Sequence, residues 1–491
     1  MLYILYSYNV KKLKYCIINQ MLFYLMKLKY LLENYEKLLD TIVTVNGWIQ
    51  TVRSQKDLSF IKLNDGSNAG GVQLIVDSNL EEKKGNIDEI NIGSSIKATG
   101  LLVKSPGGGQ PYEIQVKKLE VLGLAPIADY PLSKGKLPLD YLRNYAHLRT
   151  RTQTFGSVFR IKSGISNATH AFFKLKGYLH INPNIITINE CEGGAGVFQI
   201  TEHDISDHSK LPEIKDSTRH DWTRDHFSKP AYLTVSSQLQ LEALSCALGS
   251  VYTTNKSFRS EHSMTNKHLS EFEHLEIEDA FITLDELMQV GEDYIKWVGQ
   301  YLLDNCSEDI NNLGKFVSKG LVERINTIVK SKFKRVRYSE AIDILKQASG
   351  LSKPVVYGED LCSEFENYLT EHFAGPVFVS HWPIAIKSFY MKQCIDGSGE
   401  CENFDLLMPY KVGELIGGSI REDNLDAMLD IMKKKGVTPE PLDFYLDLRR
   451  FGTVPHGGFG LGLDRMCMMF TGMESIKDVV AFPVCYKTCE Y

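Results

Sequence analysis

Alternating apolar and polar residues fill the stretch from Thr41 to Gly123. Five short runs are separated by Asn, Asp and Gly, and they read TIVTVNGWIQTVR, LSFIKLNDG, VQLIVDS, SSIKATGLLV and YEIQVKKLEVLG. A period of two is typical of strands that bury one face, and turn residues between such runs are typical of a sheet of short strands. Five short strands with these turns predict a small closed barrel of the OB type.

A longer period begins after the Pro-rich stretch 126–140, PIADYPLSKGKLPLD, which we interpret as a hinge between domains. From Thr154 to Lys176 the apolar residues recur mostly at steps of three and four, so we expect one amphipathic helix there. Gly177 ends this helix, and the run YLHINPNIIT that follows is a strand interrupted by Pro183. A proline is tolerated in a strand only at an edge or a bulge, and an edge strand can pair with a second chain, so we expect a two-fold homodimer.

The hydrophobic pattern after residue 283 indicates first helices and then strands. Residues 284–353 are mostly helical in character and show no catalytic motif. From Pro376 onward, four runs favour strands again: PVFVSHWPIAI, CENFDLLMPY, GELIGGSIRE and DFYLDLRRFG. We find no fixed-period repeat and no low-complexity tract.

The composition limits the number of domains, the mode of any nucleic-acid binding and the state of the cysteines. A chain of 491 residues is too long for one compact domain, and a content of 43% hydrophobic and 24% charged residues is typical of globular proteins. The formal net charge of -6 excludes nucleic-acid binding through bulk positive charge alone, so such binding requires local patches and base stacking. The 10 cysteines show no zinc-ligand spacing, which favours free thiols in a reducing compartment.

The N-terminal stretch before Glu33 holds five Lys and no acid. Its apolar runs are too short, and too often broken by Lys, to cross a bilayer. Two interpretations stay open: an organelle transit peptide, against which the lack of Arg and the low Ser content count, or a Lys/Tyr-rich extension ahead of a natural start at Met21 or Met26. We therefore expect a cytoplasmic protein without membrane contact, with a mitochondrion or plastid as the alternative location.

Two arginines are the first candidates for chemistry. Arg259 and Glu261 in SFRSEH are two positions apart and would share one face of a strand. A fixed guanidinium can donate two hydrogen bonds to a phosphate or a carboxylate, while an exposed ion pair is the alternative interpretation. Arg465 opens an apolar helix in GTVPHGGFGLGLDRMCMMF, after three alternating glycines that end at Gly462. Such glycines let a ligand approach the backbone closely, and their spacing does not fit a Rossmann motif.

Acids and amides form the second group of candidates. Asp405 and Glu414 lie in neighbouring strand segments, and carboxylates together with triphosphate oxygens are the ligands that Mg²⁺ prefers. Gln238 and Glu242 are four positions apart and share one face of a predicted helix, and Arg421 follows a Gly-Gly turn. For each of these sets, ordinary solvated residues are the alternative interpretation.

Together these residues fit the activation of a carboxylate by ATP. Arg259 would hold the α-phosphate while the carboxylate attacks it, and Phe272 would stack on the adenine ring. Arg465 and Mg²⁺ would hold the pyrophosphate end of the nucleotide. The barrier would fall because the charge that builds on the transferring group meets cations already in place.

At this point the chain resembles a known family, the asparaginyl-tRNA synthetases of the bacterial type, which are class II aminoacyl-tRNA synthetases. The resemblance runs from Thr41 to about Pro483 and rests on YLRNYAHLRTRT, FRSEHSMTNKHLSEF, IGGSIRE and RRFGTVPHGGFGLGLDR. It implies an α+β fold with an N-terminal OB-fold, an antiparallel six- or seven-stranded catalytic sheet flanked by helices, and a homodimer. The domains it implies are an extension at 1–40, an anticodon-binding OB-fold at 41–124, a hinge at 125–140 and a class II catalytic domain at 141–491.

The resemblance also implies roles for single residues. Arg259 matches the catalytic arginine that contacts the α-phosphate and the amino-acid carboxylate, and Arg465 matches the catalytic arginine of the third family motif. Phe272 matches the ring that stacks on adenine. The other implied ATP ligands are Glu261, His268, Leu269, Glu414 and Gly462, and the implied Mg²⁺ ligands are Asp405 and Glu414.

Selection of asparagine over aspartate is a finer implication. Glu192 and Gln238 match residues around the substrate α-amino group. Related aspartyl enzymes carry a lysine where this chain has Leu241, and Glu242 follows it. Glu242 can accept hydrogen bonds from an asparagine amide but repels aspartate, and Arg421 can donate to the amide oxygen.

In the predicted barrel, Phe60 and Gln73 match the aromatic and amide residues with which the family contacts the anticodon of tRNA. Stacking of an unpaired base on the Phe60 ring is the expected interaction, and a core position for Phe60 is the alternative. The chain also departs from the family pattern, with Lys267 where arginine is usual, Glu273 where tryptophan is usual, and Val484 where the family has the arginine of Phe-Pro-Arg.

The resulting hypothesis is an aminoacyl-tRNA ligase. L-Asparagine and ATP give asparaginyl-adenylate, and the asparaginyl group then passes to tRNA(Asn), with ATP as a substrate and Mg²⁺ as a cofactor. Two alternatives stay open. One is an aspartyl enzyme with relaxed tRNA specificity, and the other is a paralogue that binds RNA without charging it.

Overall fold

The computed structural model describes residues 27–107, 110–133, 137–189 and 196–491. The chain divides into two compact units, Met1–Arg160 and Ile161–Tyr491. Among the helices in the described ranges, none is both long enough and apolar enough to cross a membrane. The expected domain limits at residues 40, 124 and 140 stay predictions.

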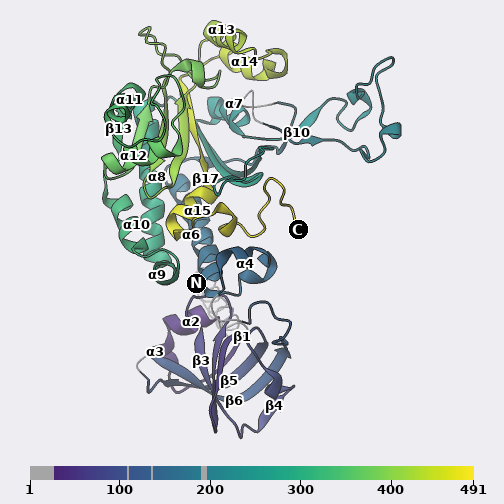
Figure 1. Ribbon diagram of the computed structural model, residues 1–491, viewed down its shortest axis with the longest axis vertical. Helices are drawn as coiled ribbons and strands as arrows, with labels where there is room; N and C mark the ends of the chain where they lie inside the picture. The colour runs from purple at the N-terminus through teal and green to yellow at the C-terminus, as the bar shows by residue number, and fades with distance from the viewer. Residues whose placement is uncertain (1–26, 108–109, 134–136, 190–195) are drawn as a thin grey trace, which may run out of the picture. The chain divides into compact units, whose positions relative to one another are not determined.

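The first unit is built on a six-stranded sheet of order β3-β2-β1-β5-β6-β4, in which β3 also pairs with β6 (Figure 1). Its strands are β1 (Ile42–Ser54), β2 (Leu58–Asn64), β3 (Val72–Asp77), β4 (Glu82–Lys84), β5 (Ser95–Lys104) and β6 (Tyr112–Gly123). The pairing of β3 with β6 closes the sheet on itself, so the predicted OB-type barrel is confirmed. The three-residue strand β4 was not among the five predicted runs.

Two short helices precede the barrel, α2 (Leu28–Glu33) and α3 (Tyr35–Leu38). Leu28 and Leu31 on α2 are buried and belong to the same apolar cluster as the inward-facing residues of the strands. The end of the expected N-terminal extension therefore packs on the barrel core, while residues 1–26 lie outside the described ranges.

The predicted helix at 154–176 is confirmed within one residue as α6 (Gln153–Leu175). It is preceded by α4 (Leu139–Arg143) and α5 (Ala146–Arg149). Gly177, with φ of 84°, follows the helix in the left-handed conformation that favours glycine.

The second unit contains an eight-stranded sheet of order β13-β14-β15-β16-β17-β12-β11-β7 (Figure 1). Its strands are β7 (Leu179–His180), β11 (Ser250–Phe258), β12 (Glu271–Ala280), β13 (Lys334–Arg337), β14 (Val377–Ser380), β15 (Asn403–Met408), β16 (Gly413–Ile420) and β17 (His456–Gly462). The six central strands pair antiparallel, and the two outer pairs, β13–β14 and β11–β7, are parallel. The antiparallel sheet is thus confirmed with one more strand than expected. The single strand predicted for YLHINPNIIT is wrong, because the run forms β7 at the edge of this sheet and β8 (Ile186–Thr187) in another sheet, with Pro183 in neither.

Helices flank this sheet. They are α7 (Gln238–Leu248), α8 (Leu284–Asn305), α9 (Ser307–Phe316), α10 (Leu321–Lys330), α11 (Tyr338–Gln347), α12 (Ser363–His372), α13 (Leu425–Lys435), α14 (Asp443–Arg450) and α15 (Leu463–Thr471). Short 3-10 turns complete the described elements at Ile87–Glu89, His208–Lys210, Trp222–Arg224, Ile384–Ile386, Glu440–Leu442 and Ile476–Asp478. A side chain at Gly291 of α8 would meet Ile416, Phe378 and Phe459, so α8 lies directly on the apolar face of the sheet.

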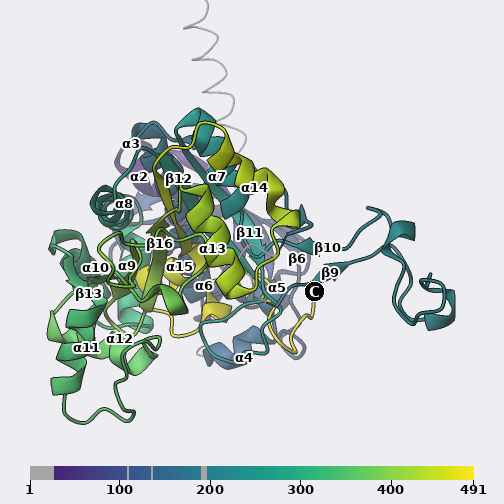
Figure 2. The same ribbon diagram turned by 90° about the horizontal axis from the view of Figure 1, so that it is seen from above.

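The strand predicted nearest the C-terminus is also wrong. The run DFYLDLRRFG forms helix α14, and α14 packs beside α7 (Figures 1 and 2). Tyr445, Leu446 and Arg449 are its buried residues, and their spacing of one and four is helical. The pattern was misleading because Phe444 and Phe451 are exposed, at 42% and 75%, while Arg449 is buried.

A third, small sheet of order β8-β10-β9 carries a long excursion of the chain. It consists of β8 (Ile186–Thr187), β9 (Gln199–Ile200) and β10 (Ala231–Leu233). The segment between β9 and β10 projects away from the eight-stranded sheet in both views (Figures 1 and 2).

Candidate active site

The β11–β12 hairpin positions the first predicted arginine. We predicted Arg259 and Glu261 on one strand, but β11 ends at Phe258, so both lie beyond it. The strand ends because its pairing with β12 stops at Phe258 and Glu271. The main-chain N–H of Arg259 still donates to the carbonyl oxygen of Ser270 at 2.9 Å, which holds Arg259 at the base of the loop that connects β11 and β12. Glu261 is exposed in this loop.

Arg259 and Phe272 lie side by side at the base of this loop. The guanidinium carbon is 5.5 Å from the centroid of the half-buried Phe272 ring, and the rings of Phe272 and His274 are 5.5 Å apart. Residues at every second position of β12 share a face, so Phe272 and His274 lie on the side opposite buried Leu275. An arginine beside an aromatic face suits a nucleotide, whose base stacks and whose phosphates need a cation.

The glycines of β17 have a different role from the one predicted. A side chain at Gly460 would meet His274 Nε2 at 2.6 Å, and one at Gly458 would meet the carbonyl oxygen of Ile277 at 2.1 Å. Packing against the neighbouring strand therefore requires glycine at both positions. At Gly462 a side chain would meet only Arg465 Cβ within 4 Å, at 3.7 Å, so this position remains open.

His268 links the two predicted arginines. Burial lowers the pKa of this imidazole, Glu261 opposes the effect, and the nearby positive charges of Arg465 and Arg259 lower the pKa further. The neutral form of His268 is therefore favoured in the absence of an anion. Leu269, the neighbouring residue, is buried at 7% exposure.

Arg465 lies against Glu414, one of the two predicted Mg²⁺ ligands. Its Nη1 donates to the main-chain carbonyl oxygen of Glu414 at 2.6 Å. Asp405 and Glu414 lie on the paired strands β15 and β16, and both carboxylates face Gly417. A side chain built there would be 3.4 Å from Glu414 Oε1 and 3.6 Å from Asp405 Oδ1. Lys387 Nζ donates to the other oxygen of Asp405 at 2.8 Å.

These carboxylates fit a hard divalent cation. Burial raises the pKa of Glu414 to about 7, and the negative charge of Asp405 adds to the rise, while Arg465 opposes it. Two carboxylates that repel each other across a shared opening form an oxygen donor set, and a divalent ion between them relieves the repulsion.

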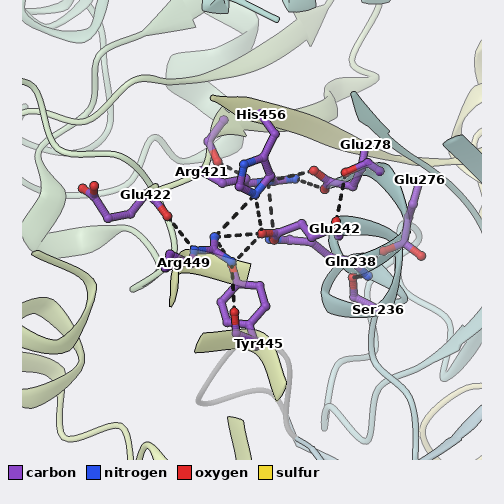
Figure 3. Close-up of polar contacts among 12 residues, drawn as sticks. Ser236, Gln238, Glu242, Glu276, Glu278, Arg421, Glu422, Tyr445, Arg449 and His456 are labelled. Carbon is purple, nitrogen blue, oxygen red and sulfur yellow. Dashed lines mark hydrogen bonds and ion pairs between the residues drawn. The ribbon is translucent and has the colours of Figure 1, made fainter. Parts of the chain in front are cut away.

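A second cluster surrounds Glu242, which is fully buried on α7 (Figure 3). Its Oε2 accepts hydrogen bonds from Tyr445 Oη at 2.7 Å and from Arg449 Nη2 at 3.0 Å, and it lies 3.0 Å from His456 Nε2. Its Oε1 accepts one hydrogen bond, from Gln238 Nε2 at 2.9 Å. Burial alone would raise the pKa of Glu242, but Arg449 and His456 hold it well below its ordinary value, so Glu242 stays ionised.

Arg421 lies beside Glu242 in the same cluster (Figure 3). Its Nε is 3.8 Å from Glu242 Oε1 and donates to Glu278 Oε2 at 3.2 Å, while its Nη2 donates to the other oxygen of Glu278. Its Nη1 donates to Ser419 Oγ at 2.7 Å. Burial raises the pKa of Glu278 to about 7, against the opposing effect of Arg421. The paired carboxylates in turn raise the pKa of Arg421, which keeps its charge.

Glu276 fixes the start of α7. Its carboxylate accepts hydrogen bonds from the main-chain N–H of Ser237, at 3.0 and 2.9 Å, and from the Ser236 hydroxyl. An anion at a helix N-terminus satisfies unpaired N–H groups and is favoured by the helix dipole. Strand β12 thereby positions the helix that carries Gln238 and Glu242.

Two predicted site residues lie on the barrel and one lies outside the described ranges. Phe60 on β2 and Gln73 on β3 are half-buried, and they lie on the face opposite buried Ile61 and Leu74. Phe60 is therefore not a core residue. Glu192 falls among the residues that the structure does not describe.

Several residues of the two clusters were missed from the sequence. Lys387 directly follows the run PVFVSHWPIAI, where nothing in the sequence marked it as a partner for Asp405. Tyr445 and Arg449 lie in the run that was wrongly predicted as a strand. His456 stands directly before the alternating glycines, and its place beside them was the one available signal.

Two of the departures from the family pattern have a local structural context. The Glu273 carboxylate lies 3.3 Å from Lys162 Nζ, and its main-chain N–H donates to Asp464 Oδ2 at 2.9 Å. Lys162 also pairs with Asp464 at 2.6 Å, so Glu273 belongs to a three-residue ionic cluster. The carbonyl oxygen of Val484 accepts the Ser270 N–H at 2.8 Å, which connects the C-terminal segment to the residue that precedes β12.

Known proteins similar to this chain agree with this geometry. Residues 139–485 match the family "tRNA synthetases class II (D, K and N)", and residues 43–122 match the family "OB-fold nucleic acid binding domain". An asparagine–tRNA ligase of Microcystis aeruginosa is 41% identical over 446 residues, which cover 90% of this chain and 95% of the relative.

Two solved structures are similar over most of their length. The asparaginyl-tRNA synthetase of Pyrococcus horikoshii, complexed with asparaginyl-adenylate, has a TM-score of 0.78 at 30% identity and covers 91% of this chain and 96% of its own. The asparaginyl-tRNA synthetase of Entamoeba histolytica, also in complex with asparaginyl-adenylate, has a TM-score of 0.79 at 28% identity and covers 92% and 97%.

The fold and the charged clusters are thus those of a class II tRNA synthetase. The chain belongs to this family and, within it, to the asparagine–tRNA ligases.

Proposed function

We propose that this chain activates L-asparagine with ATP and transfers the asparaginyl group to tRNA(Asn). The proposal follows from membership of the family, and one structural observation carries the chemistry. Arg465 donates to the main chain of Glu414, and the Glu414 and Asp405 carboxylates converge on Gly417. One arginine and a carboxylate pair suited to Mg²⁺ would together bind a triphosphate, on the same sheet whose strand β11 leads to Arg259.

In the proposed reaction, the asparagine carboxylate attacks the α-phosphorus of ATP. Arg259 donates to the α-phosphate oxygens and steadies the charge that builds there, and Phe272 stacks on the adenine. Arg465 would neutralise the leaving pyrophosphate, and His268 and Glu261 would assist in binding the nucleotide. Asp405 and Glu414 would hold Mg²⁺, which supplies positive charge to the phosphates.

Glu242 supplies the proposed discrimination between asparagine and aspartate. Three neighbours crowd around its Oε2, whereas Oε1 accepts one hydrogen bond and a carboxylate oxygen can accept two. Oε1 is therefore the atom available to a substrate amide N–H. Because Glu242 stays ionised, an aspartate carboxylate at the same place would meet a buried negative charge.

Arg421 would complete this recognition. Its Nε lies 3.8 Å from Glu242 Oε1, so an amide that binds Oε1 through its nitrogen can place its oxygen near the guanidinium. An amide has one donor side and one acceptor side, and the carboxylate–arginine pair matches both.

The asparagine-dependent exchange of pyrophosphate into ATP tests the first half of the reaction. The proposal predicts exchange with the wild-type chain and a loss of exchange in Arg259→Ala. An exchange rate no higher in the wild type than in Arg259→Ala would contradict it. Tight tRNA binding without exchange would support the non-charging alternative.

The barrel would bind the anticodon of tRNA. Phe60 presents a half-buried ring on the outer face of β2, and Gln73 is the cross-strand partner of Lys62 on the same face. An aromatic ring, an amide and a lysine suit a single-stranded base and its phosphate. This local patch reconciles RNA binding with a net charge of -6.

We also propose a homodimer and a cytoplasmic location. Strand β7 forms one edge of the catalytic sheet, and Leu179 and Ile186 near that edge are exposed at 48% and 46%, which suits a covering second copy. Light scattering of the purified chain tests the dimer. A mitochondrion or plastid is the alternative location, and imaging of residues 1–45 fused to a reporter distinguishes the compartments.

A further inference from the structure

The excursion between β9 and β10 carries a cluster that the proposed reaction does not use. His203, His220 and Asp225 each offer one ligand atom, and these three atoms lie within 4.8 Å of one another. His220 Nε2 is 3.6 Å from Asp225 Oδ2, and the rings of His203 and His220 meet edge to face with centroids 5.4 Å apart. Three metal-ligating side chains thus converge from both arms of the excursion.

Each of these side chains has one polar atom that is buried without a hydrogen bond among the described residues. These atoms are His203 Nε2, His220 Nε2 and Asp225 Oδ2. Asp225 is only 7% exposed, and its other oxygen accepts main-chain N–H groups from Glu202 at 3.2 Å and from His226 at 2.7 Å. These bonds fix the carboxylate and leave Oδ2 directed at the imidazoles. Buried polar atoms without partners are rare, and a shared cation would satisfy all three atoms at once.

We propose that His203, His220 and Asp225 bind one transition-metal ion of the zinc type. Two imidazoles and a carboxylate are a donor set that Zn²⁺ takes, with ligand bonds of about 2.0–2.2 Å. Tetrahedral ligands at that distance are about 3.3 Å apart. The 3.6 Å between His220 Nε2 and Asp225 Oδ2 is close to that value, and the other separations, at most 4.8 Å, would shorten when the ion binds. A fourth position is left for water.

A simple ion pair does not account for the cluster equally well. The 3.6 Å separation of His220 and Asp225 is too long for a good hydrogen bond, and pairing these two residues leaves His203 Nε2 buried without a partner. A single ion at the centre accounts for all three side chains, which is why we prefer it.

The ion would act as a brace. His203 follows β9 and Asp225 precedes β10, so metal binding would close the loop between the two arms of the excursion. Just before β9, the carbonyl oxygen of Gly196 accepts the main-chain N–H of Ser260 at 2.8 Å. The chain that leads into the braced segment is thereby hydrogen-bonded to the loop residue that follows Arg259.

Cobalt binding to the full, untagged chain tests the site. Co²⁺ is the probe because its visible absorption reports ligand type, and imidazole and carboxylate ligation lacks the sulfur charge-transfer band that the free cysteines would produce. After chelator treatment and dialysis, we expect the wild type to bind about one Co²⁺ per chain without that band. His203→Ala and His220→Ala should each reduce cobalt binding to background.

His226→Ala is the matched control, because His226 lies in the same excursion with its side chain 63% exposed and paired with Glu202. It should bind cobalt as the wild type does. Equal binding in His203→Ala and His220→Ala, or no stoichiometric binding by the wild type, would overturn the proposal. A measurement on the unaltered chain guards against misfolded variants: Zn²⁺ should slow proteolytic cleavage between His203 and His220, and an unchanged cleavage rate would also overturn it.

Discussion

Arg465 donates a hydrogen bond to the main-chain carbonyl oxygen of Glu414 at 2.6 Å. The bond joins the first turn of helix α15 to the beginning of strand β16, so the guanidinium is in place before any nucleotide binds. A cation held in this way stabilises charge in the transition state without rearranging during the reaction.

Replacing this arginine should therefore impair chemistry more than folding. We expect Arg465→Ala to lower the rate of asparagine-dependent pyrophosphate exchange by about 10²–10³-fold. Arg450→Ala is the control, because Arg450 is an exposed arginine that pairs with Asp443 and Asp447 on α14. Equal rates in the two variants, measured by radiolabel exchange, would contradict the role given to Arg465.

Removing the charge of Glu414 from the Asp405–Glu414 pair should raise the Mg²⁺ concentration that the exchange reaction requires. In Glu414→Gln the opening at Gly417 keeps its shape but loses one ionised ligand. We expect the Mg²⁺ concentration for half-maximal exchange to rise by about tenfold or more. Glu440→Gln, on an exposed turn of the same unit, should leave this concentration unchanged. An unshifted Mg²⁺ dependence in Glu414→Gln would argue against a metal ligand at this position.

Glu242 should stabilise the folded chain in a pH-dependent way. Its folded pKa lies well below its ordinary value of 4.5. The stabilisation is therefore fully present above pH 4.5 and falls as the pH drops from there toward the folded pKa. Glu242→Gln leaves Arg449 and His456 without their anion, which should cost about 3–5 kcal/mol at neutral pH.

Urea midpoints of the full chain between pH 4 and pH 7 check both statements. The difference between wild type and Glu242→Gln should be largest near neutral pH and should shrink toward pH 4. Glu261→Gln, an exposed loop position, provides the comparison. A gap that widens on acidification would show that the sign assigned to Glu242 is wrong.

Phe60 should affect tRNA binding without affecting amino-acid activation. Loss of base stacking in Phe60→Ala should weaken tRNA binding by about 1–3 kcal/mol. Phe60→Tyr keeps an aromatic face and should bind nearly as the wild type does. Filter binding gives the affinity, and pyrophosphate exchange without tRNA should be the same in all three proteins. A loss of exchange in Phe60→Ala would indicate a folding defect in place of lost stacking.

Much of the fold was predictable because single elements have clear periods. The alternating runs of the barrel and the steps of three and four in α6 placed those elements nearly as observed. The failures have physical causes. Helix α14 buries Arg449 beside Tyr445, and a charged residue at a buried position interrupts the apolar pattern by which a short helix is recognised in a sequence. Strand β13 has only four residues, too few for a period to show within a helical region.

The candidate site was less accessible to prediction, because its residues meet only through sheet pairing. The arginines and acids at 259, 405, 414 and 465 stood out by type and by family motif. Lys387 did not, since its importance is its contact with Asp405, 18 positions away. The three partners of Glu242 Oε2 are more than 200 positions distant, so the sequence suggested a substrate ligand but not the buried network that fixes its charge.

Selectivity between asparagine and aspartate tests the central claim most directly. The measurement is kcat/KM for pyrophosphate exchange with each amino acid, using the wild-type chain at neutral pH. Because ionised Glu242 accepts an amide N–H and repels a carboxylate, we predict that asparagine exceeds aspartate by at least about 10³-fold. Comparable values for the two amino acids, or a preference for aspartate, would contradict the account.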